Sequence, residues 1–89
     1  MKSRTTAAFR KAFRGLPDRV KREATVAYDR FRIDPWHPSL KFKKVHSTQP
    51  IFSVRIGRAY RAIGIREGDE IIWYWIGSHA DYDKLLEQL

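Results

Sequence analysis

The sequence predicts an α+β domain in which an N-terminal αα-hairpin packs on a four-stranded antiparallel sheet and a short helix ends the chain. Three observations support this fold class. Apolar residues before Pro35 recur with helical spacing, those from about residue 40 to residue 76 form short runs between turn residues, and those after Ser78 return to helical spacing. The 89 residues contain no repeat and no linker, so we expect one domain spanning residues 1–89.

The segment before Pro35 predicts two helices joined by a tight turn. Either Thr5 or Thr6 can cap the first helix, and Gly15 and Pro17 separate the first helix from the second. The apolar positions recur every three or four residues, at Phe9, Phe13, Leu16, Val20, Ala24, Ala27 and Phe31. The other faces form a basic surface that is by default solvated, with Arg10, Lys11, Arg14, Arg19, Lys21, Arg22, Arg30 and Arg32.

Strands follow the turn at Asp34–Ser39, where two prolines prevent the helix from continuing. Their short spacing indicates an antiparallel meander. The expected strands are Leu40–Val45, Ile51–Ile56, Tyr60–Arg66 and Glu70–Ile76. Ile51–Ile56 alternates apolar and polar residues, so one face should lie on a core that the helices cover. Ile71–Ile76 has no polar face, so this strand is either central in the sheet or beside a site.

A last helix is expected after Ser78, which can act as its N-cap. Its helical spacing is carried by Tyr82, Leu85 and Leu89. The sequence therefore ends as it began, on an amphipathic helix.

The charge of the chain favours a polyanionic partner. Lys and Arg total 18 against 10 Asp and Glu, which gives a net charge of +8. Residues 1–33 carry +7, residues 34–61 carry +5 and residues 62–89 carry −4, so a bipolar surface follows unless the fold interleaves these segments. The absence of cysteine excludes disulfides and thiolate sites, and no apolar run is long enough to span a membrane. We expect a cytoplasmic protein with no membrane partner.

Three passages of the chain carry a resemblance to a known family. Ser53–Ile63 reads Ser-Val-Arg-Ile-Gly-Arg-Ala-Tyr-Arg-Ala-Ile and resembles the L-R-I-G-x-Y-R-I-I-Y core of the RelE/ParE superfamily of toxins. Asp34–Val45 resembles the passage with proline, leucine and lysine that precedes this core. Ile76–Tyr82 resembles the G-T/S-H-x-D endings of the YafQ-like and related branches. Together with the element order, the resemblance covers the chain from Phe9 to Tyr82.

The resemblance implies the toxin of a type II toxin–antitoxin pair, which is held by a cognate antitoxin and cleaves mRNA on the ribosome without a metal or other cofactor. It further implies inhibited translation and a 2′,3′-cyclic phosphate product. The sequence departs from the family pattern in three places. Only Met1–Arg4 precede the first helix, so the usual first strand is very short or absent; Arg58 or Ala59 is an extra turn residue; and Tyr82 follows His79 by three positions, where four are more common.

Metal-free cleavage of RNA needs a base for the 2′-hydroxyl, cations for the phosphate and an acid for the departing 5′-oxygen. The resemblance assigns the transition-state cation to Arg61, whose guanidinium can hold two phosphate oxygens. His79 is the natural acid because imidazole titrates near neutrality. Arg55 can point from the same face of the neighbouring strand. The further candidates are Lys43 and Tyr82 as catalytic residues, Lys41, Lys44 and Arg58 as RNA-binding residues, and Asp81 as the residue that orients His79.

Each assignment has a structural alternative. Arg61 could pair with Glu67 or Asp81 on the sheet surface, and His79 could be an ordinary residue at a helix start near Asp81 or Asp83. Tyr82 could anchor the last helix in the core instead of stacking on a base. The three histidines lack metal-ligand spacing, so we expect no metal site.

Two other functions fit the same sequence. One is a ParE-type inhibitor of DNA gyrase, which binds without catalysis, and the other is a non-toxic binding module on the same fold. Trp73 and Trp75 alternate with Tyr74, so one side of this strand should face the core and the other could be the surface that an antitoxin helix covers.

Overall fold

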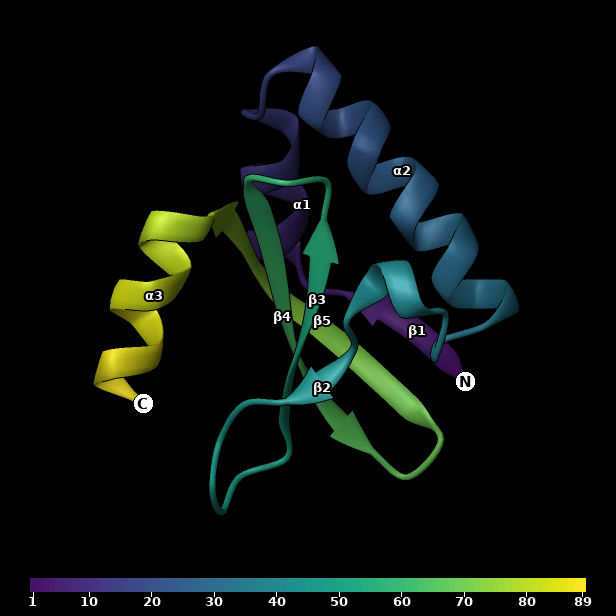
Figure 1. Ribbon diagram of the computed structural model, residues 1–89, viewed down its shortest axis with the longest axis vertical. Helices are drawn as coiled ribbons and strands as arrows, with labels where there is room; N and C mark the ends of the chain where they lie inside the picture. Colours follow the sequence, from purple (N-terminus) through teal and green to yellow (C-terminus); the bar gives the residue numbers. More distant parts are fainter.

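The computed structural model describes residues 1–89 and confirms the α+β fold class, with a five-stranded sheet between two layers of helix. In chain order the elements are β1 (Lys2–Thr5), α1 (Ala7–Arg14), α2 (Asp18–Ile33), the 3-10 turn η1 (Pro38–Leu40), β2 (Lys43–Lys44), β3 (Ile51–Ile56), β4 (Tyr60–Glu67), β5 (Glu70–Ser78) and α3 (His79–Gln88). The strand order is β1-β5-β4-β3-β2 (Figure 1). No helix is both long enough and apolar enough to cross a bilayer.

The expectation of four antiparallel strands is wrong in one respect, because β1 adds a fifth strand that runs parallel to β5. Trp73 fixes this pairing by donating from its indole Nε1 to Ser3 Oγ at 2.9 Å. Arg4 pairs with Glu70 at 3.2 Å, so the basic start and the acidic end of the chain do interleave here. The strand that the family pattern requires is therefore short but present, and β5 is an interior strand.

The prediction of a strand over Leu40–Val45 is also mostly wrong. Pro38–Leu40 forms the turn η1, and Lys41 follows it in the left-handed region with φ 49°. Only Lys43 and Lys44 pair with β3, opposite Ser53 and Phe52. Leu40 and Phe42 are both buried in the core, at 1% and 8% exposure, and the left-handed Lys41 between them turns the chain from η1 towards β2.

The helix boundaries follow the predicted caps. Thr6 accepts a hydrogen bond from the Phe9 N–H at 3.1 Å and begins α1, and Gly15 ends it. Pro17 precedes α2, which begins at Asp18. Ser78 caps α3 by accepting from the Asp81 N–H at 3.2 Å. The caps of α1 and α3 are thus local, and tertiary hydrogen bonds from the Thr6 N–H to the Trp73 carbonyl and from the His79 N–H to the Ala59 carbonyl support them.

The sheet has a core on each face. On one face α1 and α2 cover the larger cluster, which is Ala24, Phe31, Leu40, Phe42, Val54, Ile56, Ala62, Ile71, Trp73 and Ile76. On the other face α3 covers a smaller cluster of Ile51, Ile63 and Tyr82. Figure 1 shows α3 apart from α1 and α2, with the strands between them. The expectation that the helices cover one apolar face holds for α1 and α2 only.

A bulge in β5 explains why this strand has no polar face. The register shifts so that Ile63 lies opposite Trp75 and Gly64 lies opposite Trp73, which leaves Tyr74 as an extra residue. Tyr74 and Trp75 both pack against the α3-side cluster, while Trp73 packs in the larger core. The bulge therefore turns two successive aromatic residues to the face that carries the candidate site.

Candidate functional site

Two arginines lie side by side on the face of the sheet that α3 partly covers. Arg55 in β3 is directly opposite Arg61 in β4, and Arg61 is directly opposite Gly77 in β5. Cβ atoms of such cross-strand neighbours are about 5 Å apart. Both arginines are half-buried, so the sheet brings two cations together at one place. The strand register thus places Arg55 and Arg61 on the same face of the sheet, as expected.

The charge of Arg61 is only partly compensated. Burial of the guanidinium lowers the pKa of Arg61, and the neighbouring charge of Arg55 lowers it further, while Tyr82 and Asp83 act in the opposite direction. Its Nη1 donates to the Tyr60 carbonyl at 2.8 Å, and no carboxylate forms an ion pair with it. The alternative pairing with Glu67 or Asp81 is therefore not observed. A half-buried guanidinium in this setting favours a bound anion.

His79 stands at the start of α3, next to this pair. Its backbone N–H donates to the Ala59 carbonyl at 2.7 Å, which ties α3 to the turn between β3 and β4. Its Nε2 lies 3.5 Å from Asp83 Oδ1, and its ring centroid is 5.9 Å from that of Tyr82. Because the charge of Asp83 also acts on Arg61, the imidazole, the carboxylate and the guanidinium share one neighbourhood.

The predicted orienting role of Asp81 is not what the structure shows. Asp81 contributes its backbone N–H to the Ser78 cap, and the carboxylate beside His79 is that of Asp83. The reason is helical geometry, since residues at i and i+4 share a face of a helix and residues at i and i+2 do not.

Tyr82 is an anchor of the α3-side core. It is 5% exposed, and its hydroxyl donates to Ser53 Oγ at 3.0 Å beneath the two arginines. The ring cannot stack on a base from this position. The structure thus places Tyr82 as the spacing within α3 favoured, and its hydroxyl already has a partner.

We expect Tyr82→Phe to lower the free energy of unfolding by about 1 kcal/mol, the usual contribution of a hydrogen bond whose loss leaves a buried hydroxyl without a partner. Catalytic turnover should stay within about 2-fold, since the ring still anchors α3. Urea unfolding and an RNA cleavage assay measure the two quantities. Ser53→Ala and the double variant complete a mutant cycle, and a large loss of turnover in Tyr82→Phe alone would restore a chemical role for the hydroxyl.

The lysines of the β2 region do not act as one group. Lys43 is opposite Ser53 and therefore faces the side of Arg55 and Arg61, whereas Lys44 is opposite Phe52 and faces the side of α1 and α2. Lys41 is exposed at the end of η1. Arg58 is exposed in the β3–β4 turn. Of these predicted residues, only Lys43 joins the two arginines on their face.

Sequence reasoning named Asp83 only as a possible neighbour of a non-catalytic His79, and it did not place Trp75 in this site. Trp75 lies across Gly77, so that a Cβ on Gly77 would meet the indole Cζ2 at 2.7 Å. The bare Cα of Gly77 thus leaves space for an aromatic ring beside Arg61, where a nucleobase could stack. Burial raises the pKa of the adjacent Tyr74, so its phenol remains neutral.

Together, these side chains can stabilise an oxygen atom that gains negative charge during a reaction. Two guanidinium groups can hold one phosphate, with Lys43 on one side and His79 on the other. No three His, Asp or Glu side chains gather as metal ligands. The chemistry that these residues offer is cationic stabilisation with proton transfer from an imidazole.

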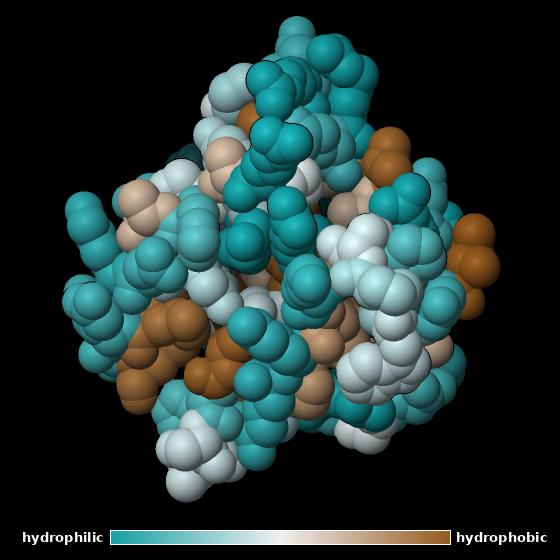
Figure 2. Space-filling view, viewed as in Figure 1, coloured by the Kyte–Doolittle hydropathy of each residue, from teal (hydrophilic) through white to brown (hydrophobic).

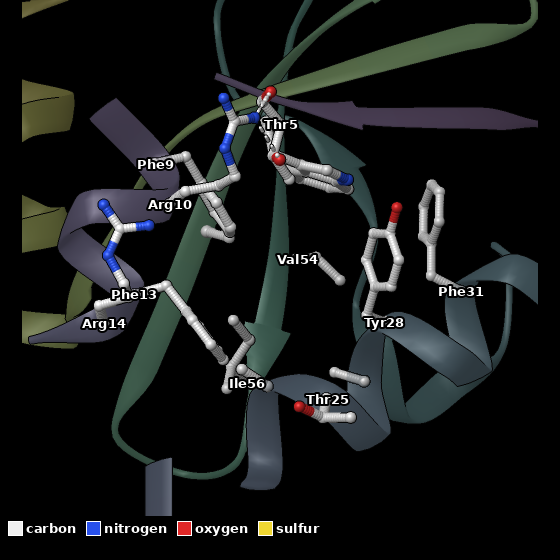
Figure 3. Close-up of a pocket in the computed structure, with 14 residues that line it drawn as sticks. Thr5, Phe9, Arg10, Phe13, Arg14, Thr25, Tyr28, Phe31, Val54 and Ile56 are labelled. Carbon is white, nitrogen blue, oxygen red and sulfur yellow. Dashed lines mark hydrogen bonds between the residues drawn. The ribbon is translucent and has the colours of Figure 1, made fainter. Parts of the chain in front are cut away.

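A second surface lies on the opposite face of the sheet. It is an apolar groove of about 420 Å³ between α1 and α2 (Figure 3). Its lining residues are Thr5, Phe9, Arg10, Phe13, Arg14, Ala24, Thr25, Ala27, Tyr28, Phe31, Val54, Ile56, Ala62 and Trp73. Figure 3 shows Phe9 and Phe13 on one wall, Tyr28 and Phe31 on the other, and Val54 between them. The charged side chains at this groove, Arg10 and Arg14, are both basic.

Comparison with known proteins gives one family and several structures. The family model described as the ParE-like toxin domain matches residues 18–84. No curated protein sequence matches the chain. The matched region includes α2, the strands β2 to β5 and the start of α3, and hence Arg55, Arg61 and His79.

Three solved structures show the same fold. The RelB–RelE antitoxin–toxin complex of Methanococcus jannaschii has a chain with a TM-score of 0.74 and 16% identity, over 92% of this chain and 96% of that chain. The RelE–RelB complex of Pyrococcus horikoshii OT3 gives 0.67 and 18%, over 86% and 92%. YafQ of E. coli strain BL21(DE3) gives 0.67 and 11%, over 91% and 96%.

Proposed function

The chain belongs to the ParE-like toxin domain family, and on that premise we propose that it is the toxin of a type II toxin–antitoxin pair and acts as a metal-independent endonuclease on mRNA. The observation that carries the enzymatic part is the half-buried Arg55–Arg61 pair with His79 beside it. A toxin that only binds a protein target does not need two like charges next to each other on a sheet. A phosphate between them would relieve their repulsion.

The proposed reaction is an internal transfer at phosphorus. The ribose 2′-hydroxyl gives up its proton to a solvent water as its oxygen attacks the phosphate, the bond to the 5′-oxygen breaks, and the products are a 2′,3′-cyclic phosphate and a 5′-hydroxyl. Arg61 and Arg55 stabilise the charge on the phosphate oxygens, and His79 gives a proton to the departing 5′-oxygen. Lys43, on the side of Arg55 away from His79, stabilises the attacking oxygen. Trp75 holds a neighbouring base by stacking.

The ribosome is the expected place of this reaction, in the cytoplasm. The site has one imidazole and relies otherwise on cations, so it depends on an RNA that is already held in a bent conformation. The net charge of +8 favours association with ribosomal RNA. Translation would stop as messages are cut.

The partner expected to control this activity is a cognate antitoxin, as in the complexes from Methanococcus jannaschii and Pyrococcus horikoshii. The antitoxin binds this chain in the apolar groove between α1 and α2 and not on the face of the sheet that carries Trp75. The groove offers aromatic walls for an apolar stripe, and Arg10 and Arg14 for acidic residues beside that stripe. The fitting occupant is an amphipathic helix of the antitoxin with acidic flanks.

Inducible expression in a bacterial host tests the proposed function. Incorporation of labelled amino acids and of labelled nucleotides is followed separately, and mRNA 5′ ends are mapped, with the double variant Arg61→Ala/His79→Ala as the control. We expect early arrest of translation and new mRNA 5′-hydroxyl ends that the control lacks. Circular dichroism of both purified proteins establishes that the control is folded.

A gyrase inhibitor is the second candidate, because the matching family model carries the ParE name. It would stop DNA synthesis first and would remain toxic in the Arg61→Ala/His79→Ala variant. A non-toxic binding module would cause no arrest in either form. Each of these outcomes would replace the endonuclease proposal.

A further inference from the structure

A third surface of the molecule is a strongly basic groove, of which the proposed reaction uses only Arg55. It lies between α2, η1 and the turn from β3 to β4, has a volume of about 610 Å³ and shares only Ala27 with the apolar groove. Its lining is Arg19, Arg22, Glu23, Val26, Ala27, Arg30, Ser39, Leu40, Arg55, Gly57 and Arg58. Figure 2 shows a mostly hydrophilic surface over the upper part of the molecule, where α2 and the β3–β4 turn lie in Figure 1.

The guanidinium groups of this groove are poorly compensated. Five arginines face a single carboxylate, Glu23, which pairs with Arg19 at 3.2 Å. Arg30 donates to Ser39 Oγ at 3.0 Å, and Arg55 donates from Nε to the Gly57 carbonyl at 2.8 Å, so these two are oriented by neutral partners. A cluster of oriented arginines is suited to bidentate contacts with phosphate.

The arrangement is linear. Arg19, Arg22 and Arg30 lie on one face of α2, and the eleven residue steps from the first to the last correspond to about 16 Å of helix. The facing wall is Arg55 and the β3–β4 turn, beside an open strand edge, because β2 ends opposite Ser53 and leaves the rest of β3 without a paired strand on that side. The groove therefore matches an extended chain of negative charges better than one small anion.

The lining also argues against a protein segment as the occupant. Only Val26, Ala27 and Leu40 are apolar, and Leu40 is 1% exposed, so the groove lacks the aromatic or aliphatic anchors that peptide binding requires. Contacts to a sugar–phosphate backbone come mainly from arginine, lysine and polar groups. The composition of the groove matches this second kind of partner.

Glu23 holds a particular position in the groove. A Cβ on Gly57 would overlap the Glu23 carboxylate, so this carboxylate rests on the bare Cα of Gly57, in the left-handed turn with φ 57°. It therefore lies among Arg19, Arg55 and Arg58 in the same groove. A carboxylate at this place screens the arginines and competes with a phosphate for them.

We propose that this groove binds the backbone of an RNA strand, with Glu23 as an internal competitor that limits the affinity. Arg55 lines the groove and also lies opposite Arg61, so it connects the bound strand to the candidate catalytic pair. The identity of the strand as RNA rests on the proposed function, whereas the phosphate chemistry rests on the groove alone. The α2 arginines are thus binding residues outside the reacting centre.

The test measures binding without cleavage. A fluorescent single-stranded RNA with 2′-O-methyl riboses, which cannot form the cyclic phosphate, is titrated with the full chain at several salt concentrations. The variant is Arg19→Gln/Arg22→Gln/Arg30→Gln, and the control is Lys2→Gln/Lys11→Gln/Lys84→Gln, which removes three exposed cations outside the groove. Both variants have the same net charge, and circular dichroism checks that both are folded.

We expect the groove variant to bind the RNA about 10- to 100-fold more weakly. The slope of log K against log salt concentration should also become shallower by about 2, because each lost phosphate contact on a single strand removes about 0.7 from this slope. The control should change affinity less than about 3-fold. Glu23→Gln should bind several-fold more tightly than the unchanged chain, and Glu87→Gln on α3 should not.

Equal losses in the groove variant and the control would overturn the proposal, and so would unchanged affinity in Glu23→Gln. A poly-glutamate peptide that binds as tightly as the RNA at the same salt would reassign the groove to an acidic protein. Single-stranded DNA of the same sequence reports whether the strand must be RNA: if it binds more tightly than the RNA, the RNA assignment is wrong. Binding as expected, with no new mRNA ends in cells, would leave the groove in place and overturn only the endonuclease.

Discussion

Arg61→Gln should lower the rate of RNA cleavage by about 100- to 1000-fold, the usual effect of removing one group that stabilises a transition-state oxyanion. The physical reason is the position of Arg61 between Arg55 and Gly77, half-buried and without a carboxylate partner, where its charge is available to a phosphate. Arg61→Lys keeps the charge but loses the planar fork, so an intermediate loss is expected. Cleavage of a ribosome-bound message, mapped by primer extension, measures the rate.

Arg66→Gln is the matched control, because Arg66 lies in the same strand and its Nε donates to the Gly68 carbonyl at the far end of β4. Its guanidinium rests on the rings of Trp36 and Phe52, away from the Arg55–Arg61 pair. This variant should cleave at nearly the unchanged rate. If Arg61→Gln cleaves as fast as Arg66→Gln while folded, Arg61 has no role at the reacting phosphate.

The second large effect is expected on the partner. Arg10→Glu/Tyr28→Ala should weaken antitoxin binding by about 100-fold or more, equivalent to about 2.7 kcal/mol. The variant reverses a charge at the mouth of the apolar groove and removes a wall that is 37% exposed, so little of the core is lost. Calorimetry with the purified protein encoded beside this gene gives the affinity.

This groove and the Arg55–Arg61 pair lie on opposite faces of the sheet, so Arg10→Glu/Tyr28→Ala should remain toxic and should escape rescue by co-expressed antitoxin. Lys2→Glu/Lys11→Glu, which reverses charges outside the groove, should bind and be rescued normally. Full rescue of the groove variant would mean that the antitoxin docks elsewhere, with the Trp75 face as the next surface to test.

Much of the fold could be predicted because its signals are local. The helical spacing of Phe9, Phe13 and Leu16, the caps at Thr6 and Ser78, and the alternation in Ile51–Ile56 each depend on residues close in sequence. Such features are encoded by local propensity, spacing and capping, and tertiary contacts then stabilise them.

The errors fall where distant residues decide. β1 is only four residues long, and its pairing with β5 depends on contacts such as that between Ser3 and Trp73. The turn at Pro38–Leu40 depends on burial of Leu40 in a core that the rest of the chain builds. Neither a short edge strand nor a burial-driven turn leaves a periodic pattern in the sequence.

The candidate site was predicted in part for the same reason. The pairing of Arg55 with Arg61 follows from a short turn between two successive strands, so the sequence was sufficient to place them on one face. Trp75 across Gly77 and the buried hydrogen bond of Tyr82 arise from the bulge in β5 and the docking of α3, whereas Asp83 lies beside His79 because of the i, i+4 spacing within α3.

By itself, then, the sequence determined the helices, their caps, the central strands and the surplus of positive charge, since these are set by neighbouring residues and by composition. Only the tertiary structure decided which lysine faces the arginine pair, that the start of α3 lies beside this pair, and that the α2 arginines and Arg55 line one groove around Glu23. The physical reason is that a site is a set of side chains brought together from distant segments, and packing rather than local preference fixes their directions.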